Sequence, residues 1–125
     1  DTLAPMALSH ELGDAWRSWC HAASEDASGR FELDFMAAAW RGYCEGLERR
    51  PTDSERRAAL IGVEHVGLEL AIRFAADALD ESYFGWDARR YPSRGAHNLA
   101  RARAQHGLYR EVVARRAARE RVLRR

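Results

Sequence analysis

The sequence predicts an all-α protein, a bundle of about four helices arranged around one long central helix. Apolar residues recur at helical 3–4-residue spacing in four stretches, and the alternation typical of strands is almost absent. A Ser/Glu/Asp/Gly run at 24–29 and a proline at position 51 separate these stretches. The third stretch has an apolar face too wide for a surface helix, so we expect it to be central.

The first two helices follow an irregular lead-in over residues 1–9, where Pro5 disfavours an early helix. We predict the first helix over about 10–23 and the second over about 33–48. Each has one apolar stripe that predicts its buried face: Leu12, Trp16, Trp19, Cys20 and Ala23 in the first, and Leu33, Met36, Trp40, Cys44 and Leu47 in the second.

The third helix is predicted over about 53–80. Thr52 and Glu55 have the spacing of a capping box, with Thr52 as the N-cap residue. Gly62 and Gly67 each cost about 1 kcal/mol in a helix, so we expect them to permit close approach of another helix. Two neighbouring apolar stripes run along it: Leu60, Val63, Gly67, Leu70 and Phe74, and Ile61, His65, Leu68, Ile72, Ala75 and Leu79.

The last quarter of the chain is predicted as an aromatic loop over 81–96 and a final helix over about 97–122, capped by Asn98 or a neighbour. Leu99, Ala102, Tyr109, Val112 and Val113 should face inward and most arginines outward. The 125 residues fit one helical domain, 1–125.

Composition limits the cellular setting. No apolar run reaches the roughly 18 residues of a membrane span, and no signal-peptide pattern is present. Two distant cysteines, Cys20 and Cys44, do not make a disulfide framework, and we interpret them as reduced core thiols. Cys20-His21 lacks partners at zinc-ligand spacing. We therefore expect a cytoplasmic protein without a membrane partner.

The opening segment carries a family pattern. The residues Asp1, Thr2, Pro5, Gly13, Asp14 and Arg17 match, without a gap, the pattern D-T-x-x-P-G, about four variable residues, then D-F-G-D-x-x-R. This pattern resembles the aminoglycoside-phosphotransferase-like kinases, in the branch similar to N-acetylhexosamine kinases. Met6 replaces the usual glycine, and Glu11-Leu12 replaces Asp-Phe.

The C-terminal half resembles the same branch. Its matching pieces are Glu69-Leu70-Ala71-Ile72-Arg73-Phe74, Asp77, Tyr83-Phe84 and His97-Asn98-Leu99-Ala100-Arg101. Order and spacing agree, so the resemblance covers nearly the whole chain. It implies that these helices form the C-terminal helical part of a kinase-like C-lobe.

The resemblance also implies ATP- and Mg²⁺-dependent phosphoryl transfer to a hydroxyl of a sugar or similar small molecule. Such transfer needs a phosphate-covering loop, a phosphate-pairing lysine and a catalytic loop. The chain has none of the three. By resemblance, Asp1 would be an acidic position close to the metal. We expect ATP and Mg²⁺ only in an intact parent that supplies the missing N-terminal part, and no kinase activity from this chain alone.

Aromatic and acidic side chains of the 81–96 loop are the first candidates for substrate binding, because rings pack on sugars and carboxylates bind hydroxyls. These are Tyr83, Trp86 and Asp87, with Phe84 beside them; rings that merely pin the loop to the core are the alternative. Glu11 could contact a substrate hydroxyl or be a solvated acid, and Arg73 could face the substrate cleft or belong to a solvated stripe.

Other polar residues are interpreted as structural. Asp14 and Arg17, one turn apart, should form an ion pair. Glu69 and Asp77 would support the site or form a solvated stripe, and His97 and Asn98 should open the last helix.

Two alternatives belong to other classes. Residues 101–125 hold nine arginines against two glutamates, which could bind nucleic acid, although the remainder is acidic and no binding motif is present. A helical interaction or oligomerisation module is the other, and we expect self-association through exposed apolar surface.

Overall fold

The structure, a computed structural model, describes residues 5–124 and contains five α-helices and no β-strand within that range. The helices are α1 (Leu8–Trp19), α2 (Leu33–Gly46), α3 (Asp53–Asp80), α4 (Arg94–Ala114) and α5 (Arg116–Leu123). The predicted all-α fold with a long central helix is confirmed, since α3 has 28 residues and packs against α1, α4 and α5.

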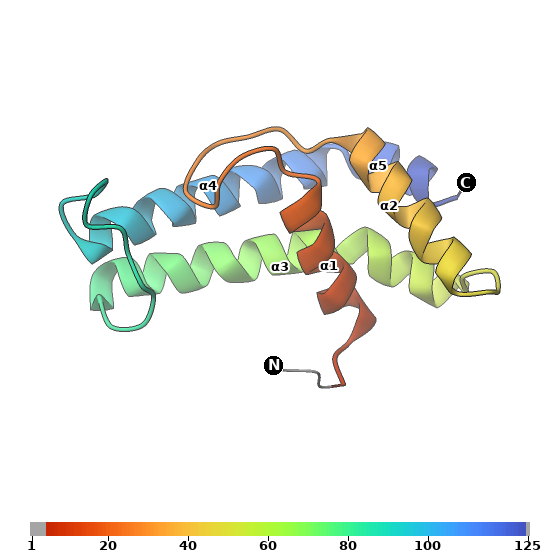
Figure 1. Ribbon diagram of the computed structural model, residues 1–125, viewed down its shortest axis with the longest axis horizontal. Coiled ribbons are helices and arrows are strands. Elements are labelled where there is room, and N and C mark those ends of the chain that lie inside the picture. Colours follow the sequence, from red (N-terminus) through yellow and green to blue (C-terminus); the bar gives the residue numbers. More distant parts are fainter. Residues whose placement is uncertain (1–4, 125) are drawn as a thin grey trace.

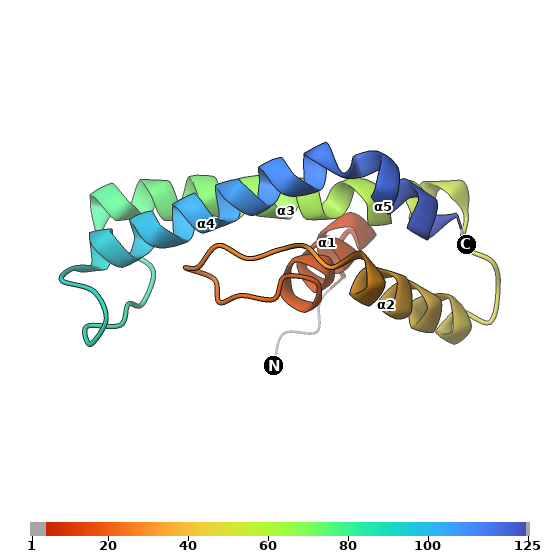
Figure 2. The same ribbon diagram turned by 90° about the horizontal axis from the view of Figure 1, so that it is seen from above.

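The helices form two layers. Helices α3 and α4 run side by side along the long axis, and α5 follows α4 near the start of α3 (Figure 1). Figure 2 shows that α1, α2 and the connection between them lie on one side of the α3–α4 pair. The core lies between the layers and is formed by Leu12, Trp16, Cys20, Phe31, Met36, Trp40, Ala59, Val63, Leu108, Val112 and Leu123.

Helix α1 crosses α3 at two glycines. A Cβ atom built on Gly62 would lie 3.1 Å from the Cα atom of Gly13 and closer still to the carbonyl oxygen of Ser9. Trp16 is fully buried at this crossing and donates its indole N–H to the carbonyl of Ala59 at 3.0 Å. The predicted close approach holds at Gly62, whereas Gly67 has only ordinary contact with Tyr109.

The start of α3 has the predicted capping box. The Thr52 hydroxyl accepts from the Glu55 N–H at 3.2 Å, and the Glu55 carboxylate accepts from the Thr52 N–H at 2.7 Å. Arg49 also donates to this carboxylate, at 2.6 Å. The Arg49 bond, followed by the Thr52 N–H, lowers the pKa of Glu55 to about 2. The helix therefore begins where the sequence places it.

The first helix differs from its prediction. It starts two residues earlier, at Leu8, and ends at Trp19 rather than near 23. The chain turns back after α1, because the Glu32 N–H donates to the Cys20 carbonyl at 2.7 Å and His21 pairs with Phe31 in an isolated antiparallel bridge. Trp19 was predicted to face inward and is instead 62% exposed.

The predicted single helix over 97–122 is wrong in two respects. Its N-cap is Ser93, whose hydroxyl accepts from the Ala96 N–H at 3.0 Å, so Asn98 lies inside the helix and caps nothing. It is also two helices, α4 and α5, which meet at Arg115. Leu99, expected to face inward, is 42% exposed.

A buried arginine stabilises the break between α4 and α5. Arg119 is fully buried, and its guanidinium donates to the carbonyls of Val112 (2.9 Å from Nε) and Leu60 (2.5 Å from Nη1) and pairs with Glu64. Arg116 binds the same carboxylate through Nε at 2.9 Å. These donors outweigh burial and hold the pKa of Glu64 below its usual value. The break is thus fixed by contacts with α3.

Only one of the two predicted stripes of α3 is covered. Val63 and Phe74 of the first stripe are buried, whereas Leu68, Ile72 and Leu79 of the second are 37%, 60% and 87% exposed. The wide apolar face predicted for α3 is therefore covered along one stripe and exposed along the other.

Both cysteines are free, as predicted. Cys20 is buried, which raises the pKa of its thiol to about 12, and Cys44 is half-buried. Within residues 5–124, no helix combines the length and apolar character that crossing a membrane requires.

Candidate functional site

An open groove of about 600 Å³ lies where the 81–93 loop meets α3 and α4. Helix α3 contributes Phe74, the loop contributes Trp86 and Asp87, α4 contributes Arg101, and the connection between α1 and α2 contributes Glu25. The groove therefore combines aromatic surface with acidic and basic side chains from four segments of the chain.

Asp77 fixes the loop that forms one wall of the groove. Its carboxylate is buried near the end of α3 and accepts from the N–H groups of Ser82, Tyr83 and Phe84, each at 2.8 Å. Asn98 of α4 donates its side-chain amide to the same carboxylate at 2.7 Å. Burial alone would raise the pKa of Asp77, but the three backbone donors outweigh it and the pKa is lowered. The carboxylate is therefore a charged anchor for the loop.

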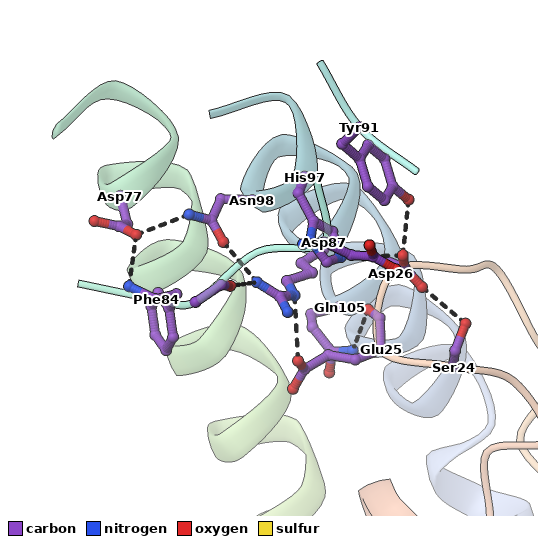
Figure 3. A network of polar contacts seen from close by, with 12 residues as sticks. Ser24, Glu25, Asp26, Asp77, Phe84, Asp87, Tyr91, His97, Asn98 and Gln105 are labelled. Atoms are coloured by element: carbon purple, nitrogen blue, oxygen red, sulfur yellow. Dashed lines mark hydrogen bonds and ion pairs between the residues drawn. The ribbon is translucent and has the colours of Figure 1, made fainter. Parts of the chain in front are cut away.

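Figure 3 shows the Asn98 side chain pointing toward the Asp77 carboxylate. Arg101 connects this anchor to the groove. Its Nη1 donates to the Gly85 carbonyl at 2.7 Å and to the Asn98 side-chain oxygen at 3.0 Å. Its guanidinium carbon lies 5.4 Å from the ring centroid of Phe74, and its Nε lies 3.4 Å from the Glu25 carboxylate. Arg101 thus joins the loop, both long helices and the α1–α2 connection.

A second cluster surrounds Asp26, whose side chain is 4% exposed. Its carboxylate accepts from the Tyr91 hydroxyl at 2.7 Å and the Ser24 hydroxyl at 2.8 Å, and Arg90 lies 3.0 Å away. The Tyr91 bond is the largest cause of a pKa well below the usual value of an aspartate, burial opposes it, and Ser24 and Arg90 add to the lowering. Asp26 therefore holds the 81–93 loop to the α1–α2 connection.

His97 links the Asp26 cluster to the loop, and its two ring nitrogens have different hydrogen-bond roles. Its Nδ1 accepts from the Asp87 N–H at 3.1 Å, so the ring proton belongs on Nε2, which lies 3.1 Å from the Asp26 carboxylate. Tyr91 stacks on the imidazole, with ring centroids 4.2 Å apart. In this position the buried imidazole orients the backbone of Asp87 at the groove.

The structure separates the predicted substrate residues. Trp86 and Asp87 line the groove, although one Asp87 oxygen accepts from the Arg89 N–H at 2.9 Å. Tyr83 is 72% exposed outside the groove, and Arg73 lies over its ring at 5.6 Å. Glu11 is exposed on α1 and does not line the groove. Trp86 and Asp87 are brought together at the groove, Arg73 and Tyr83 meet each other outside it, and Glu11 lies apart from both pairs.

The predicted structural residues fall into two groups. Asp77, His97 and Asn98 belong to the network behind the groove. The Asp14 carboxylate pairs with Arg17 at 2.8 Å, and Glu69 pairs with His10 at 3.1 Å and with Arg73 at 3.8 Å, all near the surface. The i,i+3 ion pair is as expected, and it lies away from the groove lining.

Four network residues had no predicted role in the site: Ser24, Glu25, Asp26 and Gln105. The first three were interpreted as part of a helix-ending run. Gln105 is buried and donates to the Glu25 carbonyl at 3.1 Å, across 80 positions of sequence. The sequence offered one signal for this network. Two adjacent acids, Glu25 and Asp26, lie in a predicted loop, and the last helix carries a histidine and arginines that could pair with them.

The predicted metal position, Asp1, lies outside the described residues. Among residues 5–124, no three histidine, cysteine, aspartate or glutamate side chains converge as a metal ion would require. The described part of the chain therefore does not fit a Mg²⁺–ATP site of its own.

Comparison with known proteins finds no family model, no curated protein and no solved structure that matches this chain.

Proposed function

We propose that the chain is the C-terminal, substrate-side helical part of an ATP-dependent phosphotransferase that acts on a hydroxyl of a sugar or similar small molecule. One observation carries the proposal. Three separate motifs that resemble the family, at Asp77, Tyr83-Phe84 and His97–Arg101, meet in one network behind one groove. Motifs from two helices and a loop that converge on a hollow are more consistent with a ligand site than with a solvated surface.

The groove lining suits such a ligand. Trp86 and Phe74 offer apolar ring surface for the C–H faces of a sugar. The carboxylates of Glu25 and Asp87 can accept hydrogen bonds from hydroxyl groups. Arg101 is held by Gly85 and Asn98, so it supports the wall in a fixed position. The lining therefore supports binding and orientation of the acceptor.

Phosphoryl transfer itself is assigned to the rest of the parent protein. ATP and Mg²⁺ require a phosphate-covering loop, a lysine and metal-binding acids. The chain has no lysine, and its described residues form no metal cluster. The isolated chain should therefore give no ATP-dependent phosphorylation of glucosamine, N-acetylglucosamine or galactose. Product formation would contradict the assignment of the nucleotide site to the missing part.

The nucleic-acid alternative gains no support. Five of the eight arginines at 101–124 are paired with acids: Arg101 with Glu25, Arg115 with Glu111, Arg116 and Arg119 with Glu64, and Arg124 with Glu120. These pairs neutralise much of the charge that a phosphate backbone would require.

Titration of the chain with the same three sugars, followed by NMR, tests the binding role. We expect a saturable shift of the Trp86 indole signal for at least one sugar. Trp86→Ala and Asp87→Asn should each weaken binding about tenfold, equivalent to about 1.4 kcal/mol. Trp19→Ala is the matched control, because Trp19 is exposed on α1 away from the groove lining. Equal losses in all three variants, or no saturable shift, would refute the groove as an acceptor site.

A further inference from the structure

A second cavity lies at the opposite end of α3 from the loop groove. Figure 1 shows α2, α5 and the 47–52 connection near the start of α3, whereas the 81–93 loop lies at its other end. Residues of α2, of this connection, of α3 and of the end of α5 line the cavity, which has a volume of about 640 Å³. This volume is in the range of small-molecule sites.

The inner wall of the cavity is apolar. Trp40 and Leu123 are 3% and 2% exposed and belong to the core, so they close the cavity on its protein side. Ala37 and Val122 add aliphatic surface. Cys44 is half-buried in the lining, and burial raises the pKa of its thiol, so the thiol adds no charge at neutral pH. This wall suits an apolar group of a ligand.

The outer wall of the cavity is basic. Its five arginines come from four segments of the chain: Arg41, Arg49, Arg50, Arg56 and Arg124. Glu45 is the one carboxylate among the lining residues. Guanidinium groups that gather beside apolar surface favour a ligand that has both an anionic and an apolar part.

Two of the five arginines have no carboxylate partner, since Arg41 and Arg50 form no ion pair within residues 5–124. The other three pair with acids that do not line the cavity: Arg49 with Glu55 at 2.6 Å, Arg56 with Asp53 at 3.5 Å, and Arg124 with Glu120 at 2.8 Å. Counting these acids and Glu45, the guanidinium groups still outnumber the carboxylates by five to four. Positive charge therefore remains at the cavity.

Two of the paired arginines are also held by the backbone. Nη1 of Arg56 donates to the Pro51 carbonyl at 2.7 Å, and Nη1 of Arg49 donates to the Arg50 carbonyl at 3.2 Å. Each guanidinium has five N–H donors, so these contacts leave donors for an anion. A side chain that is already held loses little conformational freedom when a ligand binds.

We propose that this cavity binds a small phosphate monoester that carries an apolar group. The phosphate binds Arg41 and Arg50, and the apolar group contacts Trp40 and Leu123. Guanidinium groups bind phosphate oxygens in bidentate pairs, and the phosphate carries more charge than a carboxylate at neutral pH. No residue lines both this cavity and the loop groove, so the proposal is independent of sugar binding.

Titration of the full 125-residue chain with phenyl phosphate, followed by NMR, tests this site. We expect saturable shifts of the Trp40 indole and Cys44 amide signals. Arg41→Gln and Arg50→Gln should each weaken binding about tenfold, and both positions are exposed, so both variants should fold. Arg103→Gln is the matched control, because Arg103 is exposed on α4, has no ion-pair partner within residues 5–124 and does not line the cavity.

The control variant should change the dissociation constant by less than about threefold. If Arg103→Gln weakened binding as much as Arg41→Gln and Arg50→Gln, the anion would be attracted by overall charge and the proposal would be overturned. The absence of a saturable shift in the natural chain would overturn it as well.

A comparison of ligands tests the apolar wall. Inorganic phosphate, which lacks the ring, and benzoate, which has a smaller charge, should each bind the natural chain about tenfold more weakly than phenyl phosphate. Ala37→Leu narrows the cavity without changing its charge, and it should weaken phenyl phosphate more than inorganic phosphate. Equal affinities of the natural chain for phenyl phosphate and inorganic phosphate would refute the apolar part of the site, even if Ala37→Leu failed to fold.

Discussion

Asp77 shows how one carboxylate can organise a loop of aromatic residues. It accepts three backbone N–H groups at the end of α3 and the amide of Asn98, which itself has no exposed surface. Buried donors without an acceptor are costly, so the loop conformation depends on this side chain. The carboxylate therefore preorganises the groove, because it fixes the loop on which Trp86 lies.

Replacing Asp77 should therefore release the loop. Asp77→Ala leaves five donors without their acceptor, the Ser82 hydroxyl included, and we expect the thermal midpoint to fall by about 5–10 °C. Asp80→Ala, one turn further along α3, is the control, because Asp80 is exposed and has no ion-pair partner within residues 5–124. Calorimetry of both variants measures the difference. Similar midpoints for the two would show that the Asp77 contacts do not stabilise the fold.

Asp26 should make the stability of the fold depend on pH in the acid range. Its pKa is lowered in the folded state, chiefly by Tyr91, so the folded protein binds fewer protons than the unfolded chain below the unfolded value of about 3.9. The stabilisation is complete above that value and is lost as the pH falls through the folded pKa. We expect the thermal midpoint of the natural chain to drop below about pH 4. Asp26→Asn should flatten this drop in part, since Asp77 titrates in the same direction. If the thermal midpoint of Asp26→Asn fell with pH as steeply as that of the natural chain, Asp26 would not be a source of the acid dependence.

At the scale of the helices, the crossing of α1 and α3 depends on the absence of side chains. Gly62→Ala gains helix propensity of about 1 kcal/mol, but the new methyl group would meet the α1 backbone, which cannot rotate away. We expect a net loss of about 1–3 kcal/mol in the free energy of unfolding. Gly107→Ala in α4 meets nothing within 4 Å and should gain up to about 1 kcal/mol. Urea unfolding of both variants gives the two signs, and a stabilised Gly62→Ala would disprove the close crossing.

Local sequence signals predicted elements well where local contacts decide them. The α3 bounds match because the Thr52–Glu55 capping box fixes its start within four residues. The division between α4 and α5 could not be predicted in this way. It depends on Arg119 reaching Leu60 and Glu64, which lie more than fifty positions earlier in the chain. The same limitation applies to the α1–α2 connection, which is held in place by bonds to Gln105 and Glu111, about eighty positions later in the chain.

At the scale of the whole molecule, the two layers separate two surfaces. The loop groove lies where the α1–α2 connection meets the end of the α3–α4 pair, and the second α3 stripe stays exposed outside it at Leu68, Ile72 and Leu79. The sequence predicted aromatic and acidic residues for the groove and two apolar stripes on α3. It could not predict which α3 stripe would be covered, because both have helical periodicity and only the position of α1 and α4 distinguishes them.

Arg101 contacts both walls of the loop groove, so its loss should loosen the 81–93 loop and the α1–α2 connection together. Arg101→Met keeps much of the side-chain volume over Phe74 but removes the bonds to Gly85 and Asn98 and the charge near Glu25. Amide hydrogen exchange should then accelerate about tenfold at Asp87, whose N–H is held by His97, and also in the 24–27 turn. Amides of α1 and the centre of α3 should stay protected, because their contacts do not involve Arg101. Arg103→Met, two residues further along α4 and facing solvent, is the control and should leave both loops unchanged. Faster exchange in only the 81–93 loop would show that the α1–α2 connection is held independently, and the groove would then have one fixed wall instead of two.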